Sequence, residues 1–154
     1  FGTCLLDPHG GYALADLERG KRFVSDLLGG QPVRIEGAAP WLDNAQLPED
    51  PRARLAIVVS SDEREPAAHE LLIHPRNVLI AVGTAVPALA ERVRQALQQA
   101  RIALPALACL VAANSEMASA ALHEAAAQLG VPLRFLSATA SLADLAAAVV
   151  VGCL

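Results

Sequence analysis

Two short polar turns carry the groups in this chain that could do chemistry. Gly83-Thr84 and Asn114-Ser115-Glu116 each follow an apolar run. A glycine-containing turn that leads into a helix presents free backbone N–H groups, which attract a carboxylate or a phosphate. We therefore select as candidate ligand-binding residues Gly83, Thr84, Asn114, Ser115 and Glu116. The alternative for both turns is structural: the glycine serves only the turn, and Asn114 or Ser115 only caps the next helix.

Motifs of the common catalytic and metal-binding classes do not occur in the sequence. There is no P-loop, no complete dinucleotide fingerprint and no context of a Ser/His/Asp or Cys/His site. His9-Gly10-Gly11 is typical of an ordinary turn. Cys4, Cys109 and Cys153 lie far apart among apolar neighbours, which favours buried thiols in a reducing cytoplasm over a metal site. Catalytic residues stay unassigned, and we expect neither a metal nor a resident cofactor.

The first turn lies in the stretch 75–101, which predicts a buried strand followed by an amphipathic helix. Residues 78–82 form a continuous apolar run, as in a strand covered on both faces. Leu89, Val93 and Leu97 then recur on one face of a helix. We predict Thr84 as the helix N-cap, or Pro87 in the first turn of the helix. In an open α/β sheet such a turn lies at the carboxyl edge, where ligands bind.

Strand and helix patterns alternate from residue 77 onward. After the central helix the sequence predicts a strand at 107–112, a helix that ends at 129, a strand at 133–136, a short helix from Ser141 and a last strand at 148–151. This alternation implies an α/β fold with a mostly parallel sheet and helices on both faces. If the strands at 78–82 and 107–112 are neighbours, the two polar turns lie side by side.

The part before residue 76 has a separate strand and helix order. It predicts a short strand at 3–6, a helix over 12–28, strands at 32–35, 55–60 and 71–74, and a long loop at 37–54. We therefore predict two domains: a smaller α/β linker-type domain at 1–75 and a second α/β domain at 76–154. The chain lacks an initiator methionine and ends on an apolar run, so we expect a piece of a longer protein.

Composition limits the classes of partner. The chain of 154 residues has a formal net charge of −4 and no basic stripe, which argues against a nucleic-acid partner. No apolar run reaches the roughly 18 residues of a membrane span, and no secretory signal is present. We expect a cytoplasmic protein without a membrane partner. A homo-oligomer that associates through the alanine-rich helices stays an alternative.

Two segments resemble the cobalamin biosynthesis proteins of the CbiG/CobE family. The opening of the C-terminal domain in that family is similar to residues 72–83, LIHPRNVLIAVG. A family segment of the form L-x-x-A-x-x-L-G-x-P-L-R-F resembles residues 122–135, LHEAAAQLGVPLRF. More loosely, residues 33–36 and 56–60 resemble the linker domain that precedes the C-terminal domain in CbiG.

The resemblance implies a place in corrin-ring assembly. CbiG-type proteins open the δ-lactone of cobalt-precorrin 5A and release acetaldehyde, and CobE-type proteins belong to the aerobic route. The same domain also occurs fused to precorrin-3B C17-methyltransferase. The resemblance therefore implies a corrinoid intermediate or another pathway enzyme as the partner.

This sequence departs from the family at both turns. The family's glycine, glycine, cysteine and arginine of the first turn fall on Ala81, Gly83, Thr84 and Ala85. Its serine, lysine and glutamate of the second turn fall on Ala112, Glu116 and Ser119. A carboxylate at the lysine position repels the carboxylates of corrin precursors.

Three functions follow from these observations. The first is an accessory or degenerate domain of a cobalamin biosynthesis protein, for example the non-methyltransferase part of a fusion. The second is a cobalt-precorrin 5A hydrolase that uses Thr84 and the turn at 114–119. The third is an interaction domain without a ligand.

Overall fold

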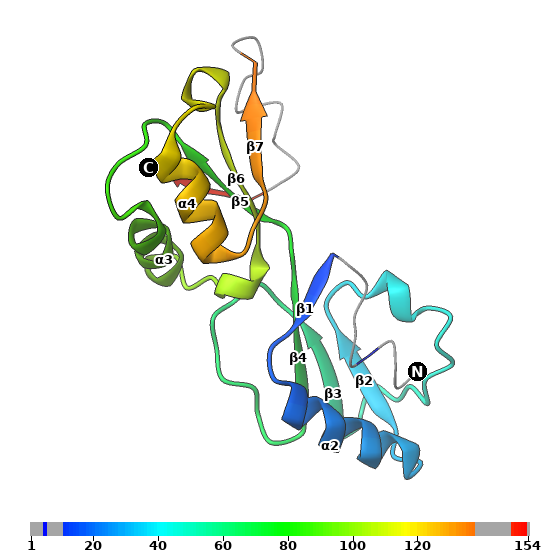
Figure 1. Ribbon diagram of the computed structural model, residues 1–154. Coiled ribbons are helices and arrows are strands. Elements are labelled where there is room, and N and C mark those ends of the chain that lie inside the picture. Colours follow the sequence, from blue (N-terminus) through cyan, green and yellow to red (C-terminus); the bar gives the residue numbers. More distant parts are fainter. Residues whose placement is uncertain (1–4, 6–10, 138–148, 154) are drawn as a thin grey trace. The chain divides into compact units, whose positions relative to one another are not determined.

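The chain divides into two compact units, Phe1–Arg76 and Asn77–Leu154, in a computed structural model that describes residues 5, 11–137 and 149–153 (Figure 1). The units are nearly equal in length, and each contains a four-stranded sheet. The fold is therefore a mixed α/β fold in which parallel strand pairs dominate. The predicted strand at Thr3–Leu6 and the His9-Gly10 turn lie outside the described residues, apart from Leu5.

The first unit contains one α-helix and four strands in the described part. In chain order its elements are β1 (Tyr12–Leu14), α2 (Leu17–Leu28), β2 (Val33–Glu36), the 3₁₀ turn η1 (Pro40–Leu42), β3 (Leu55–Val59) and β4 (Glu70–Pro75). The strand order is β1-β4-β3-β2, with β1 antiparallel to β4 and the other pairs parallel. Three of the four strands therefore run in one direction.

The helix α2 covers one face of this first sheet. Its buried side chains Phe23, Val24 and Leu27 pack with the apolar face formed by Leu55, Ile57 and residues of β4. The N-cap is Asp16, whose carboxylate accepts a hydrogen bond of 3.0 Å from the backbone N–H of Arg19. This capping bond is the local signal that starts the helix.

The sequence prediction of a helix over 12–28 is wrong at its start. Tyr12–Leu14 form strand β1, which pairs with β4 in the register Ala13↔His74. The physical reason is that a three-residue strand gains its backbone hydrogen bonds from a partner sixty residues away, which no local pattern reports.

The second unit alternates strands and helices. In chain order its elements are β5 (Val78–Val82), α3 (Leu89–Gln99), the 3₁₀ turn η2 (Leu104–Ala106), β6 (Leu107–Ala113), the 3₁₀ turn η3 (Asn114–Glu116), α4 (Ala120–Leu129), β7 (Leu133–Leu136) and β8 (Val149–Cys153). The strand order is β7-β6-β5-β8, and all three pairings are parallel. The predicted strands at 78–82 and 133–136 are confirmed.

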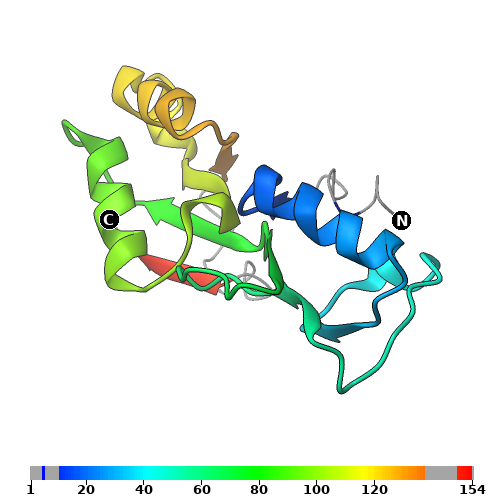
Figure 2. The ribbon, with the colours of Figure 1, turned by 90° about the horizontal axis from the view of Figure 1, so that it is seen from below.

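Both described helices of this unit belong to one hydrophobic core. Val78, Ile80 and Val82 alternate along β5 and pack with buried residues of α3 and α4, among them Val93 and Leu122. The two helices therefore lie on the same face of the sheet (Figure 2). The predicted helix from Ser141 lies outside the described residues. Within the described residues, no helix combines the length and apolarity that a membrane span requires.

Candidate functional site

The two polar turns selected from the sequence lie at the same edge of the second sheet. Strands β5 and β6 are parallel neighbours, with Val82 opposite Ala112. Gly83 leaves β5 one residue later, and Asn114 follows the last residue of β6. Parallel strands bring their carboxyl ends to one edge, so the candidate residues of both turns lie at the same edge of the sheet, at the ends of two neighbouring strands.

The first turn reaches its helix later than predicted. Helix α3 begins at Leu89, and its N-cap is Ala88, which forms no side-chain capping bond. Thr84 and Pro87 therefore lie in the exposed connection before the helix, and neither caps it. Ala88 has φ 57° and ψ 33°. A left-handed backbone costs an alanine about 1 to 2 kcal/mol, so the connection holds local strain just beside the candidate residues.

The second turn likewise reaches its helix later than predicted. Asn114–Glu116 form the 3₁₀ turn η3, and α4 begins only at Ala120 with Ser119 at its N-cap. Neither Asn114 nor Ser115 caps α4. The backbone N–H of Met117 donates to the Asn114 carbonyl at 3.1 Å, and this bond closes the turn. Asn114 and Ser115 are exposed and Glu116 is half-buried, so their polar groups face water.

His123 makes a contact at the second turn that the sequence did not reveal. Its Nε2 lies 2.9 Å from the backbone carbonyl of Met117, the residue that follows η3. The imidazole ring lies 6.1 Å from the ring of Phe135 on β7, measured between ring centroids. The side chain thus ties the end of the candidate turn to α4. Its sequence neighbours gave no signal, because the contact joins residues on two separate elements.

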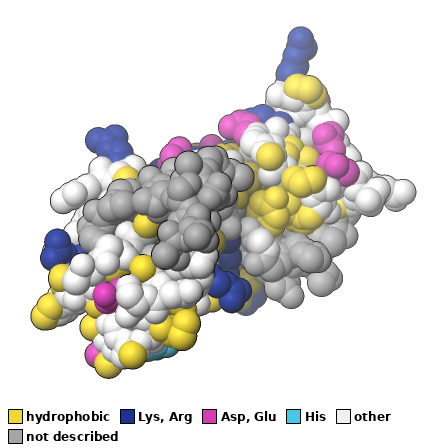
Figure 3. Space-filling model, turned by 90° about the horizontal axis from the view of Figure 1, so that it is seen from above, with side chains coloured by type: hydrophobic (Ala, Val, Ile, Leu, Met, Phe, Trp, Pro, Cys, Tyr) yellow, Lys and Arg dark blue, Asp and Glu magenta, His cyan; other side chains and the backbone are white. Residues whose placement is uncertain are grey.

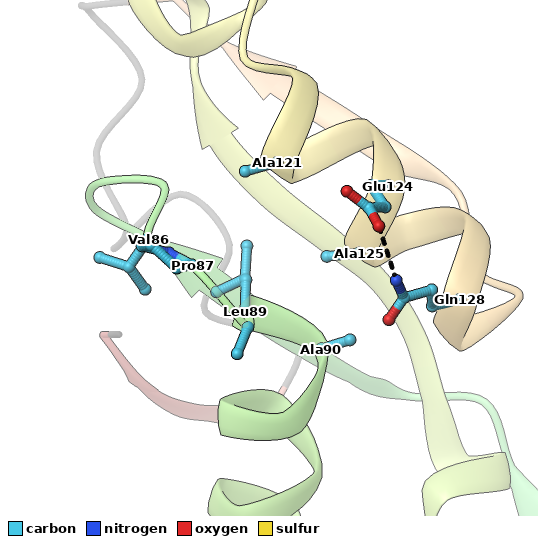
Figure 4. Close-up of a pocket in the computed structure, with 9 residues that line it drawn as sticks. Val86, Pro87, Leu89, Ala90, Ala121, Glu124, Ala125 and Gln128 are labelled. Atoms are coloured by element: carbon cyan, nitrogen blue, oxygen red, sulfur yellow. Dashed lines mark hydrogen bonds between the residues drawn. The ribbon is translucent and has the colours of Figure 1, made fainter.

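A pocket of about 280 Å³ opens between α3 and α4, next to the first turn (Figure 4). It is lined by Val86, Pro87, Ala88, Leu89, Ala90, Ala121, Glu124, Ala125 and Gln128. The alanines of both helices leave this space because their side chains are short. The start of α3 forms one wall, and the backbone N–H groups of its first turn have no capping side chain.

The pocket has one charged side chain in its lining, and that charge is negative. Glu124 accepts a hydrogen bond of 3.0 Å from the side-chain amide of Gln128 (Figure 4). Arg94 forms an ion pair with Glu91, and its other guanidinium nitrogen lies 3.4 Å from the Gln128 carbonyl. The Arg94 guanidinium is therefore engaged with groups of the two helices. The lining contains no nucleophilic side chain.

The described part of the chain contains neither a cluster of metal-ligating side chains nor an activated thiol. No group of three His, Cys, Asp or Glu side chains there is arranged to hold a metal ion. Burial raises the pKa of the Cys109 thiol, with a smaller opposite effect from Arg134, so this thiol stays protonated and is a poor nucleophile. On the face shown in Figure 3, Lys and Arg side chains are scattered and form no continuous stripe.

Comparison of this chain with known protein families, with curated proteins and with solved structures gave no match. The site is therefore defined by its geometry: an exposed polar edge beside a small, mostly apolar pocket with a carboxylate in its wall.

Proposed function

We propose that this chain is an accessory, non-catalytic part of a corrin-ring biosynthesis protein, such as a fusion with precorrin-3B C17-methyltransferase. In this proposal its second unit holds a corrinoid intermediate weakly or docks another enzyme of the pathway. One observation carries the proposal. The two turns of the resemblance meet at the carboxyl edge of a parallel sheet, but they bring together no cation and no activated nucleophile.

The finer features of the fold are part of the same proposal. We infer that the first unit is the linker-type domain and that helices cover both faces of the second sheet. The burial of Leu79, Ala81 and Val111, which alternate with the core-facing residues of β5 and β6, supports the second inference. Side chains on both faces of these strands are removed from water, as in doubly covered sheets.

Binding of a corrinoid is tested by titrating the chain with hydrogenobyrinic acid, followed by absorbance and calorimetry. We expect saturable binding with a dissociation constant weaker than about 1 μM, which corresponds to about −8 kcal/mol. The free N–H groups at the start of α3 favour the carboxylates of the ligand, whereas Glu116 and Glu124 oppose them. Absence of binding at millimolar ligand would contradict corrinoid binding and leave only the docking role.

The charge-reversed variant Glu116→Lys tests the site itself. It replaces a half-buried carboxylate with the cation that the resembling family has at this position. A charge-assisted hydrogen bond is worth about 1.5 to 3 kcal/mol, so we expect hydrogenobyrinic acid to bind about tenfold tighter or more. The matched control is Glu63→Lys, which makes the same change in net charge at an exposed residue of the other unit. If both variants bind hydrogenobyrinic acid more tightly by the same factor, the effect comes from net charge, and this result would contradict a site at Glu116.

The non-catalytic part of the proposal has its own assay. Incubation with cobalt-precorrin 5A should release no acetaldehyde above a protein-free control, because neither turn presents a side chain that is activated as a base or nucleophile. Acetaldehyde release above that control would overturn the accessory role and favour a lactone-opening hydrolase. The variant Thr84→Val would then show whether the exposed hydroxyl takes part.

A further inference from the structure

A second pocket, of about 310 Å³, lies in the first unit and is independent of the proposed site. One side is formed by α2, which contributes Arg19, Arg22, Phe23 and Asp26. The opposite side is formed by Leu55 at the start of β3 and by residues 68–70, which lead into β4. The pocket thus spans one helix and the amino ends of two parallel strands.

The floor of this pocket is apolar. Phe23 and Leu55 are 4% and 2% exposed, and both belong to the core of the first unit. A ligand in the pocket therefore meets an aromatic ring and an aliphatic side chain below the polar rim. Apolar lining with a few polar groups at the rim is the usual composition of small-molecule sites.

The rim carries two arginines, Arg19 and Arg22, together with the carboxylates of Asp26 and Glu70. Glu70 is already engaged, because its carboxylate accepts from the Ala67 N–H at 2.9 Å and from Arg64 at 2.8 Å. These two contacts, the Ala67 hydrogen bond first, lower the pKa of Glu70, so its charge persists and is balanced by Arg64. Arg19 and Arg22 share the lining with the carboxylate of Asp26, and the carboxylate of Asp16 at the start of α2 also attracts both arginines.

The two arginines still have donor groups to offer. One terminal nitrogen of Arg19 donates to the Ala67 carbonyl at 2.9 Å, but its Nε is buried and has no partner among the described residues. Arg22 is exposed, and its charge interacts with the carboxylate of Asp16, the N-cap of α2. A guanidinium presents its N–H groups as a planar fork that matches a carboxylate.

We propose that this pocket binds a small organic carboxylate, with the carboxylate held by Arg22 and Arg19 and the apolar part resting on Phe23 and Leu55. The side chain of His69 lines the same rim and can donate a further hydrogen bond. The pocket volume suits a molecule with a single ring or a short chain and is too small for a tetrapyrrole. The ligand therefore differs from that of the proposed function, and the two proposals succeed or fail separately.

The test uses benzoate as the probe, with the whole chain and calorimetry or amide chemical shifts as the readout. We expect saturable binding in the millimolar range or tighter, with shifts confined to α2, the start of β3 at Leu55 and residues 67–71. The neutral analogue benzamide should bind at least about tenfold more weakly, because it gives no charge-assisted bond to the guanidinium. Absence of saturation, or equal binding of benzamide, would overturn the proposal.

Two variants locate the effect. Arg22→Gln should weaken benzoate binding about tenfold or more, whereas Arg52→Gln, at an exposed arginine that does not line the pocket, should leave it unchanged. Both positions are exposed, so both variants are expected to fold. Equal effects of the two variants would refute the role of Arg22. Inorganic phosphate that binds as tightly as benzoate would refute the role of the apolar floor.

Discussion

Replacement of Leu110 by alanine is expected to destabilise the second unit by about 2 to 5 kcal/mol. Leu110 is completely buried in the middle of β6, between Ile80 on β5 and Leu133 on β7. Its removal loses the transfer free energy of the side chain and leaves a cavity between two strands and the helices above them. The surrounding core cannot collapse easily, because both neighbouring strands are held by their backbone ladders.

Native-state hydrogen exchange measures this effect unit by unit. Amides of β5 and β6 should lose protection in Leu110→Ala, while amides of β3 and β4 keep theirs, because each unit has its own core. The matched control is Leu28→Ala, which makes the same chemical change at a side chain that is 69% exposed. Protection losses of similar size in both units of Leu110→Ala would show that the two units do not unfold independently.

Gly37→Ala is the second substitution with a large expected effect, and it acts on the first unit. Gly37 follows β2 with φ +94°, and a Cβ built on it lies 2.4 Å from the Val59 carbonyl oxygen. The left-handed backbone costs about 1 to 2 kcal/mol for a residue with a Cβ. To relieve the overlap between the new Cβ and the Val59 carbonyl oxygen, the strand backbone must shift. Overpacking of this kind costs a further amount of about 1 to 3 kcal/mol. The measurement is exchange of the β2 and β3 amides.

Gly30→Ala separates the two contributions. Gly30 has φ +87°, close to that of Gly37, but a Cβ built on it has no atom within 4 Å. It should therefore show the backbone cost alone, about 1 to 2 kcal/mol. If Gly37→Ala and Gly30→Ala lower the free energy of unfolding equally, the overlap of the added Cβ with Val59 contributes nothing to the loss. The close approach of Gly37 to the end of β3 would then not explain why a glycine stands there.

Local patterns in the sequence were enough to identify most strands and the class of fold. The apolar run at 78–82 and the segment at 133–136 became strands with the predicted bounds. A strand that is buried on both faces has a continuous run of apolar residues, which can be recognised in the sequence. Alternation of such strands with helices implies parallel pairing. The neighbour relation of the two polar turns then followed from β5 and β6 being adjacent.

The helix starts depended on more than local composition. Good capping residues such as Thr84, Asn114 and Ser115 precede the helices. Helices α3 and α4 nevertheless begin several residues later, at Leu89 and Ala120, and neither has a side-chain cap. Packing of the helices on the sheet decides where the chain can become helical, and it outweighs the contribution of a cap, which is about 1 kcal/mol.

The sequence by itself determined the α/β class, the order of strands and helices between residues 78 and 136 and the polar character of both turns, because each of these depends on residues close together in the chain. Only the tertiary structure decided that Tyr12–Leu14 pair with β4, that His123 contacts the Met117 carbonyl, and that arginines of α2 form a rim with residues 68–70. The first and third features join segments far apart in sequence, and the second joins two elements whose relative placement local patterns do not report. The free energy of all three comes from contacts that exist only once the elements have packed.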